Sequence, residues 1–286
     1  MLTARLHTVQ WLSPSGLHKL AYREWGDPHN PHVLLCVHGL TRSSADFEAM
    51  AQDLGRDIRV VAADMPGRGA SDWLPDPALY AVPMYVNACV ALVARLNPGT
   101  LDWFGTSMGG LIGMGYASLP GNPVRKLILN DVGPSLNFKA LQRIGDYVGK
   151  PVSFHTLQEA RAYIRAISQP FGPHTEEEWN ALTDSVLRQK DGKWTPHYDP
   201  AIGQAFQNLS ESTALLHETA LWAAYDSIKA DTMVVRGEHS DLLTSETLAS
   251  MSQRGPRPKV TEIAGVGHAP TFMQNGQIAI IRNFLF

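Results

Sequence analysis

The chain has 286 residues, of which 44% are hydrophobic and 18% are charged, and its formal net charge is −3. This length and apolar content are sufficient for one large domain with a substantial core. The mild charge and the absence of a lysine- or arginine-rich block argue against nucleic acid as a partner. No stretch approaches the roughly 18 apolar residues of a membrane span, and residues 1–7 lack the apolar centre of a signal peptide. We therefore expect a cytoplasmic protein without a membrane partner.

Short β-type runs alternate with helix-type runs between residues 17 and 132. The expected strands are Lys19–Trp25, Val33–Val37, Ile58–Ala63, Thr100–Phe104 and Val124–Asn130, and the expected helices lie near 44–54, 84–96 and 108–118. Such alternation predicts an α/β fold with a mostly parallel sheet covered by helices on both faces. Cys36 and Cys89 fall in an expected strand and an expected helix, and we interpret them as small buried apolar residues rather than as a disulfide.

The alternation of strands and helices stops after Pro134, and the sequence that follows predicts several amphipathic helices without a buried strand. The expected helices are Leu157–Ile167, Glu176–Leu187 and Ser212–Ala224. Strands alternate with helices again from Thr232 to the end. This predicts a core formed by residues 1–134 and 226–286, with an insertion at 135–225.

Residues Gly105-Thr106-Ser107-Met108-Gly109 match the Gly-x-Ser-x-Gly nucleophile elbow and lie between an apolar run and a helix-type run. This motif places a serine on a sharp turn from strand to helix. Its glycines are needed because a β-carbon at either position would collide with the neighbouring strand or helix. The pattern indicates an exposed nucleophilic Ser107, although five-residue matches of this kind also occur in ordinary turns.

Polar loops follow several other expected strands. Asp241 follows the run at 232–235, and His268 follows the run at 260–263. Upstream, His38-Gly39-Leu40 ends the strand Val33–Val37, and the loop at 64–71 ends the next one. The chain order serine, aspartate, histidine is that of the α/β-hydrolases and differs from the order in other serine hydrolase folds.

On these motifs the chain resembles the α/β-hydrolase family, in particular its esterase and C–C hydrolase branches, from His38 to His268. The resemblance implies that Ser107 is the nucleophile, His268 the base and Asp241 the acid of a catalytic triad. Asp131, which ends the strand before the insertion, is the alternative acid, and Glu238 is a third candidate. The backbone N–H groups of Met108 and Leu40 are the expected oxyanion donors.

Two neighbouring features are interpreted as structural. His38 is expected to shape its turn by hydrogen bonding, and the loop at 64–71 is expected to brace the His-Gly loop. The insertion resembles the helical cap that many of these hydrolases carry after the sixth core strand, where it would cover the serine. Five aromatic residues of the insertion are candidates to bind substrate, although aromatic residues also fill the cores of helical caps: Phe138, Phe171, Trp179, Trp194 and Trp222.

The expected activity is hydrolysis of a small or medium carboxylic ester through an acyl-enzyme, without a metal or organic cofactor. A serine at the elbow argues against dehalogenase or epoxide hydrolase chemistry, for which relatives use an aspartate nucleophile. Cleavage of C–C bonds, lactones, thioesters or amides uses the same triad and remains open. A ligand-binding protein without turnover is an alternative of a different class. The expected assembly is a monomer or a small homo-oligomer.

Overall fold

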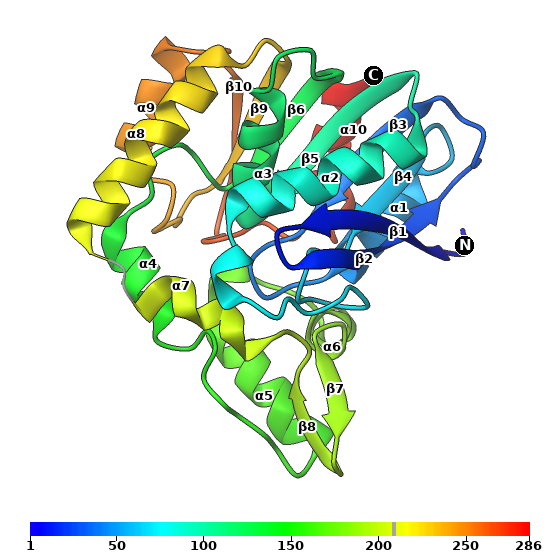
Figure 1. Ribbon diagram of the computed structural model, residues 1–286, viewed down its shortest axis with the longest axis vertical. Coiled ribbons are helices and arrows are strands. Elements are labelled where there is room, and N and C mark those ends of the chain that lie inside the picture. The colour runs from blue at the N-terminus through cyan, green and yellow to red at the C-terminus, as the bar shows by residue number, and fades with distance from the viewer. Residues whose placement is uncertain (208–209) are drawn as a thin grey trace.

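The computed structural model describes residues 1–207 and 210–286 and contains an eight-stranded sheet in the order β1-β2-β4-β3-β5-β6-β9-β10 (Figure 1). The strands are β1 (Arg5–Ser13), β2 (Gly16–Trp25), β3 (His32–Val37), β4 (Arg59–Ala63), β5 (Thr100–Thr106), β6 (Val124–Asn130), β9 (Asp231–Gly237) and β10 (Lys259–Ile263). The pairs β1–β2 and β2–β4 are antiparallel, and the other pairs are parallel. The predicted α/β fold with a mostly parallel sheet is confirmed.

Helices cover both faces of this sheet. They are α1 (Glu48–Leu54), α2 (Val82–Leu96), α3 (Met108–Ala117), α4 (Phe138–Gly145), α5 (Leu157–Ile167), α6 (Glu176–Asp184), α7 (Gln204–Gln207), α8 (Glu211–Ser227), α9 (Ser245–Gln253) and α10 (Asn275–Leu285). Short 3₁₀ helices lie at Ser44–Phe47, Pro77–Leu79, Gln169–Phe171 and Pro200–Gly203. Figure 1 shows α2 and α3 on one face and α1 and α10 on the other.

The core consists of two apolar clusters, one on each face of the sheet. Successive side chains of a strand point to opposite faces, so in β3 Leu35 packs in the cluster with α2 and α3, whereas Leu34 and Cys36 pack in the cluster with α1 and α10. Cys36 and Cys89 are both buried and unbridged, as predicted. None of the described helices is both long and apolar enough to cross a bilayer.

Three strands were not predicted, and the helix expected at Glu176–Leu187 ends at Asp184, so that Leu187 lies in a strand. Strand β1 precedes the first expected strand and pairs along its whole length with β2 at the edge of the sheet. Inside the insertion, β7 (Leu187–Lys190) and β8 (Lys193–Pro196) form a two-stranded hairpin of their own. The hairpin is largely exposed at its turn, so it carries no buried apolar run that a sequence pattern could reveal.

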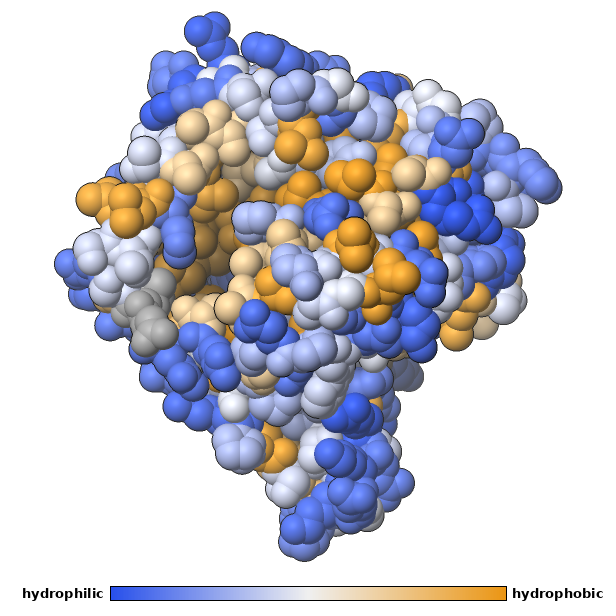
Figure 2. Space-filling view, viewed as in Figure 1, coloured by the Kyte–Doolittle hydropathy of each residue, from blue (hydrophilic) through white to orange (hydrophobic). Residues whose placement is uncertain are grey.

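The chain between β6 and β9 contains α4 to α8 and the β7–β8 hairpin. Helices α5 and α6 each begin with a capping box, formed by Thr156 with Glu159 and by Thr175 with Glu178. In Figure 1, α5, α6 and the hairpin project as a lobe beyond one edge of the core, whereas α8 returns along the core, where it contacts α3. Figure 2 shows that the tip of the lobe is hydrophilic and that an apolar hollow lies beside α8.

Candidate active site

Ser107 lies on the sharp turn between β5 and α3. Its φ of 52° and ψ of −115° are a strained combination for a residue with a side chain. A β-carbon on Gly109 would lie 1.9 Å from the backbone oxygen of Val37, and one on Gly105 would lie 2.3 Å from the backbone oxygen of Gly109. Both glycines are therefore required where β3, β5 and α3 meet, and the turn they permit presents the Ser107 hydroxyl at the end of the strand.

His268, in the loop after β10, lies next to this hydroxyl. Its Nε2 is 2.8 Å from Ser107 Oγ, and its Nδ1 is 2.7 Å from Asp131 Oδ2. The three side chains therefore form a continuous relay from hydroxyl to imidazole to carboxylate. With the Nδ1 proton donated to Asp131, Nε2 is free to accept the proton of the serine.

Asp131 is fully buried directly after β6 and adopts a positive φ of 56°. Its Oδ1 accepts the Gly237 N–H at 2.8 Å, and its Oδ2 accepts the Ser240 hydroxyl at 2.7 Å as well as the His268 N–H. Three donors thus satisfy and orient a carboxylate that would be costly to bury without partners. The arrangement fixes both the tautomer and the orientation of the His268 ring.

The prediction that Asp241 is the acid of the triad is wrong. Asp241 lies in the expected loop after β9, but its side chain is exposed and forms a bidentate ion pair with Arg143 of α4, with bonds of 2.8 and 2.9 Å. The acid that contacts His268 is the alternative, Asp131. The last residue of β9 and the loop after it instead supply two donors, the Gly237 N–H and the Ser240 hydroxyl, to the Asp131 carboxylate. Glu238, the third candidate, accepts the Gly265 N–H.

The His-Gly loop passes directly over the nucleophile. The position of a β-carbon on Gly39 lies 3.8 Å from the Ser107 β-carbon, and Leu40 follows along the edge of the same cavity. Met108 is the first residue of α3, so its N–H is one of the helix's N-terminal donors. Both expected oxyanion donors thus lie on backbone adjacent to Ser107.

Buried polar side chains hold this loop in place. The ring of His38 donates to the Gly39 carbonyl at 2.7 Å and accepts the Met65 N–H at 2.9 Å. Burial lowers the pKa of His38 to about 4, so the ring stays neutral and can both donate and accept. Arg68, also fully buried, donates to the Leu40 carbonyl at 2.8 Å. The loop at 64–71 thus contacts the His-Gly loop as expected.

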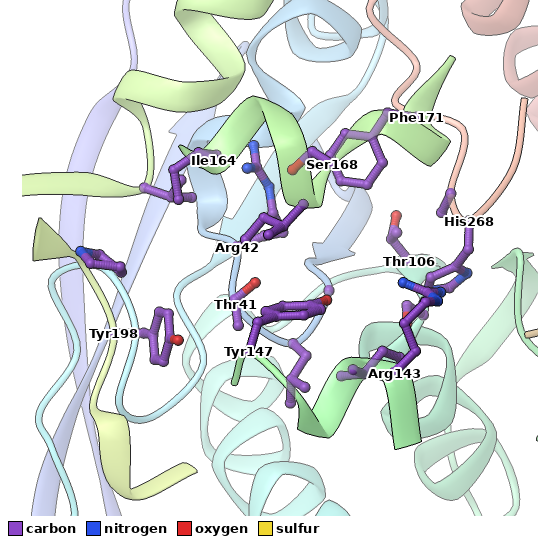
Figure 3. A pocket seen from close by; sticks show the side chains of 18 of the residues that line it. Thr41, Arg42, Thr106, Arg143, Tyr147, Ile164, Ser168, Phe171, Tyr198 and His268 are labelled. Carbon is purple, nitrogen blue, oxygen red and sulfur yellow. The ribbon is translucent and has the colours of Figure 1, made fainter. Parts of the chain in front are cut away.

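A cavity lies between Ser107 and the inserted segment. Figure 3 shows side chains that line it, among them His268 and Thr106 from the core and Tyr147 and Ile164 from the insertion. The core side is formed by residues 39–42, 106–107 and 268–269, and the opposite side comes from α4, α5 and the hairpin region. Apolar side chains from the insertion line it: Ile144, Ile164, Ile167, Phe171, Val186 and Pro196. Polar groups also line it: Thr41, Tyr147, Tyr163, Ser168 and Tyr198, together with Arg42 and Arg143.

The tyrosines of this cavity are neutral hydrogen-bonding groups at ordinary pH. Burial raises the pKa of Tyr147 to about 12 and also raises the pKa values of Tyr163 and Tyr198. The Tyr198 hydroxyl contacts the Gly149 N–H at 3.3 Å. The cavity therefore offers hydroxyl groups and apolar surface to a ligand that enters beside Ser107.

Of the five aromatic residues predicted to bind substrate, Phe171 lines this cavity and the other four do not. Trp179 is buried between His174 and Arg165, and Trp194 packs against a small apolar cluster around Ala160. Trp222 packs on the core beside Tyr225. Phe138 is the first residue of α4 and also lies outside the lining. These four side chains therefore do not line the cavity beside Ser107; Trp179 is buried within the insertion, and the other three are half-buried.

Several lining residues were missed by the sequence analysis. Arg42 could have been noticed, because it follows Leu40 by two residues in the His-Gly loop. The tyrosines carry no comparable signal, since Tyr163 lies within helix α5, Tyr147 and Tyr198 lie in loops, and none of the three belongs to a recognisable motif. Among the described residues, no three His, Cys, Asp or Glu side chains are grouped so that they could hold a metal ion.

Comparisons with known proteins identify the family of this chain. The model of the "Alpha/beta hydrolase family" matches residues 34–279. A 3-hydroxybutyrate-oligomer hydrolase of Cupriavidus necator is 51% identical over 98% of this chain and 97% of its own length. The crystal structure of a putative hydrolase from Rickettsia typhi superposes with a TM-score of 0.89 at 33% identity, covering 98% of both chains.

A second structure, an alpha/beta hydrolase from Novosphingobium aromaticivorans, has a TM-score of 0.85 at 31% identity and covers 99% of both chains. The family match and these relatives extend over nearly the whole sequence, including the serine turn and the histidine loop. The chain therefore belongs to the alpha/beta hydrolase family and is a hydrolase.

Proposed function

We propose that this chain hydrolyses ester bonds in oligomers of 3-hydroxybutyrate through an acyl-enzyme formed on Ser107. The observation that carries the proposal is the relay of two hydrogen bonds, 2.8 Å from Ser107 to His268 and 2.7 Å from His268 to Asp131. The substrate class is that of the Cupriavidus necator relative, which is 51% identical over nearly the full length of both proteins.

The first half of the reaction forms the acyl-enzyme. Ser107 Oγ attacks the ester carbonyl while His268 Nε2 takes its proton, and the Asp131 carboxylate stabilises the resulting imidazolium. The carbonyl oxygen becomes an oxyanion, for which the N–H groups of Leu40 and Met108 are the proposed donors. Collapse of this intermediate breaks the C–O bond, and His268 gives its proton to the departing alkoxide.

The second half releases the acid. A water molecule gives a proton to His268 and attacks the acyl carbon, and the same donors bind the second oxyanion. Collapse returns the proton to Ser107 and frees the carboxylic acid product. Every proton in this scheme passes through the His268 ring, and the proposed steps need no metal or organic cofactor.

The lining of the cavity suits this substrate class. A 3-hydroxybutyrate oligomer has a repeating ester group, which accepts hydrogen bonds, and a methyl branch on each unit, which is apolar. The hydroxyl groups of Thr41, Tyr147 and Tyr198 can donate to ester oxygens, and Ile164 and Val186 offer surface to the methyl groups. A mixed lining of this kind favours a short polyester over a purely aliphatic chain.

We also propose that residues 135–225 act as a cap over a core formed by residues 1–134 and 226–286. Support comes from the cavity, whose wall opposite Ser107 is built from residues between Arg143 and Tyr198. Substrate would therefore be held between two parts of the chain that are far apart from each other in sequence.

The proposal is tested by incubating the purified protein with the dimer and trimer of 3-hydroxybutyrate and following monomer release by liquid chromatography. We expect hydrolysis by the wild type and none by Ser107→Ala. A parallel panel contains a p-nitrophenyl butyrate ester, a lactone and a ring-fission diketone. Turnover of the lactone or the diketone at a higher kcat/KM than the dimer would contradict the proposed substrate class, and binding without any turnover would favour a ligand-binding protein.

A further inference from the structure

Arg143 places a cation at the mouth of the catalytic cavity. It lies in the last turn of α4, lines the same cavity as Ser107 and His268, and extends toward His268 (Figure 3). Its side chain is 40% exposed, so the guanidinium is open to solvent and to a ligand. None of the triad steps described above uses this residue.

The ion pair with Asp241 fixes the orientation of the Arg143 guanidinium. Asp241 accepts from Nε at 2.8 Å and from Nη2 at 2.9 Å, which occupies one side of the planar group. In residues 1–207 and 210–286, Nη1 has no hydrogen-bond acceptor. An arginine held in this way presents its remaining edge as a fork that matches a second carboxylate.

The charge of the lining favours an anion. Among the described residues that line the catalytic cavity, Arg42 and Arg143 are cationic and none is an aspartate or a glutamate. Arg42 is satisfied by Asp46 and by the carbonyl of Leu182, so Arg143 is the better placed of the two. Asp241 lines a neighbouring depression together with Arg236 and Ser240, on the other side of Arg143.

Resting on the function proposed above, we infer that Arg143 binds the free carboxylate of the oligomer's terminal unit and that Asp241 positions Arg143 for this role. The leaving oxygen must lie beside His268 Nε2, which protonates it. In a 3-hydroxybutyrate leaving group the carboxyl carbon is only two carbons away from the carbon that bears this oxygen. A carboxylate receptor for that unit must therefore lie next to His268, which is where Arg143 extends.

This assignment predicts the direction of cleavage. The bond that breaks joins the last unit to the rest of the chain, the acyl group left on Ser107 is the shortened oligomer, and the alkoxide that accepts the proton of His268 belongs to one 3-hydroxybutyrate. Water then releases the shortened oligomer with a new carboxylate. The enzyme would remove single units from the carboxyl end.

The test compares cleavage of the internal ester bonds in the free-acid trimer of 3-hydroxybutyrate and in its methyl ester, which keeps both internal bonds and carries a methyl ester in place of the terminal carboxylate. We expect the wild type to have a kcat/KM at least about tenfold higher for the free acid, equivalent to ~1.4 kcal/mol. In Arg143→Gln this ratio should fall close to one, and Arg143→Lys, which keeps the charge but loses the fork, should retain part of it. A trimer with ¹³C in its hydroxyl-terminal unit should release unlabelled monomer first.

Lys139→Gln is the matched control, because Lys139 is an exposed cation one turn away on α4 that does not line the catalytic cavity. It should keep the ratio of the wild type. The inference is overturned if the wild type hydrolyses both trimers equally well, if Arg143→Gln keeps the preference, or if labelled monomer appears first.

Failure of the inference is distinguishable from failure of the proposed function. If the wild type hydrolyses p-nitrophenyl butyrate but neither trimer, the substrate class is wrong and the carboxylate role falls with it. If both trimers are hydrolysed at equal rates, the proposed function holds and Arg143 has no such role.

Discussion

Replacement of Asp131 by asparagine should abolish most of the activity while leaving the fold intact. Asp131 accepts three hydrogen bonds, from His268, Ser240 and Gly237. An asparagine has nearly the same shape but replaces one acceptor oxygen with a donor NH₂ group. Its amide oxygen is expected to stay opposite the Gly237 N–H, which cannot rotate. The NH₂ group then faces His268.

The magnitude follows from the tautomer of His268. Opposite an NH₂ group, Nδ1 must accept rather than donate, so the ring proton moves to Nε2. Nε2 then donates to Ser107 and cannot take its proton, so the general base is lost. A tautomer error of this kind costs a factor of about 10⁴ in kcat in a serine protease triad, or ~5 kcal/mol of transition-state stabilisation. We expect a loss of about this size in Asp131→Asn.

The assay is kcat with p-nitrophenyl butyrate, with thermal unfolding by circular dichroism as the control for folding. Asp241→Asn is the comparison, because Asp241 contacts none of the three triad side chains and should cost no more than about tenfold in kcat, or ~1.4 kcal/mol. The assignment would be refuted if Asp131→Asn stayed within tenfold of the wild type or if Asp241→Asn lost more activity than Asp131→Asn.

Three further variants test the support of the site. Gly109→Ala should destabilise the protein by at least about 3 kcal/mol in urea unfolding, because the new β-carbon would overlap strand β3, whereas Gly276→Ala, which meets nothing within 4 Å, should change stability by less than about 1 kcal/mol. Because the pKa of buried His38 is lowered to about 4, the unfolded chain binds a proton between pH 6.5 and 4 that the folded chain does not. Stability should therefore fall as the pH is lowered, and between pH 7 and 5 the wild type should lose about 2 kcal/mol more than His38→Gln; equal losses would contradict this. Arg68→Lys leaves buried acceptors without donors and should cost about 2 kcal/mol of stability and lower kcat more than it raises KM; an unchanged kcat would show that the loop does not depend on Arg68.

The sequence predicts best the helices and strands whose burial follows one regular pattern from end to end. Strand β6 is buried and apolar along most of its length, and its predicted and observed bounds are both Val124–Asn130. Helix α5 likewise spans Leu157–Ile167, because its capping box and apolar face define both ends. Strand β1 was not predicted, because it is an edge strand that is half exposed for most of its length. Its strand conformation is stabilised by backbone pairing with β2, which its own sequence pattern does not indicate.

The site is predictable only where a motif fixes a backbone. Ser107 needs glycines on both sides, and that requirement is visible in the sequence. The choice between Asp131 and Asp241 is not visible, because β6 and β9 are adjacent parallel strands whose carboxyl ends reach the same edge of the sheet. The choice is made by local conformation, since Asp131 turns inward at a positive φ while Asp241 lies exposed against Arg143.

The central claim is that Ser107, activated by His268 and Asp131, carries the acyl group of a 3-hydroxybutyrate oligomer during turnover. The most direct test is rapid-quench mass spectrometry of the enzyme mixed with the trimer, followed by peptide mapping. The account predicts a 3-hydroxybutyryl ester chain on the peptide containing Ser107, at a level that falls in Asp131→Asn and is zero in Ser107→Ala. Turnover of the trimer by Ser107→Ala, or an adduct on a different residue, would contradict it.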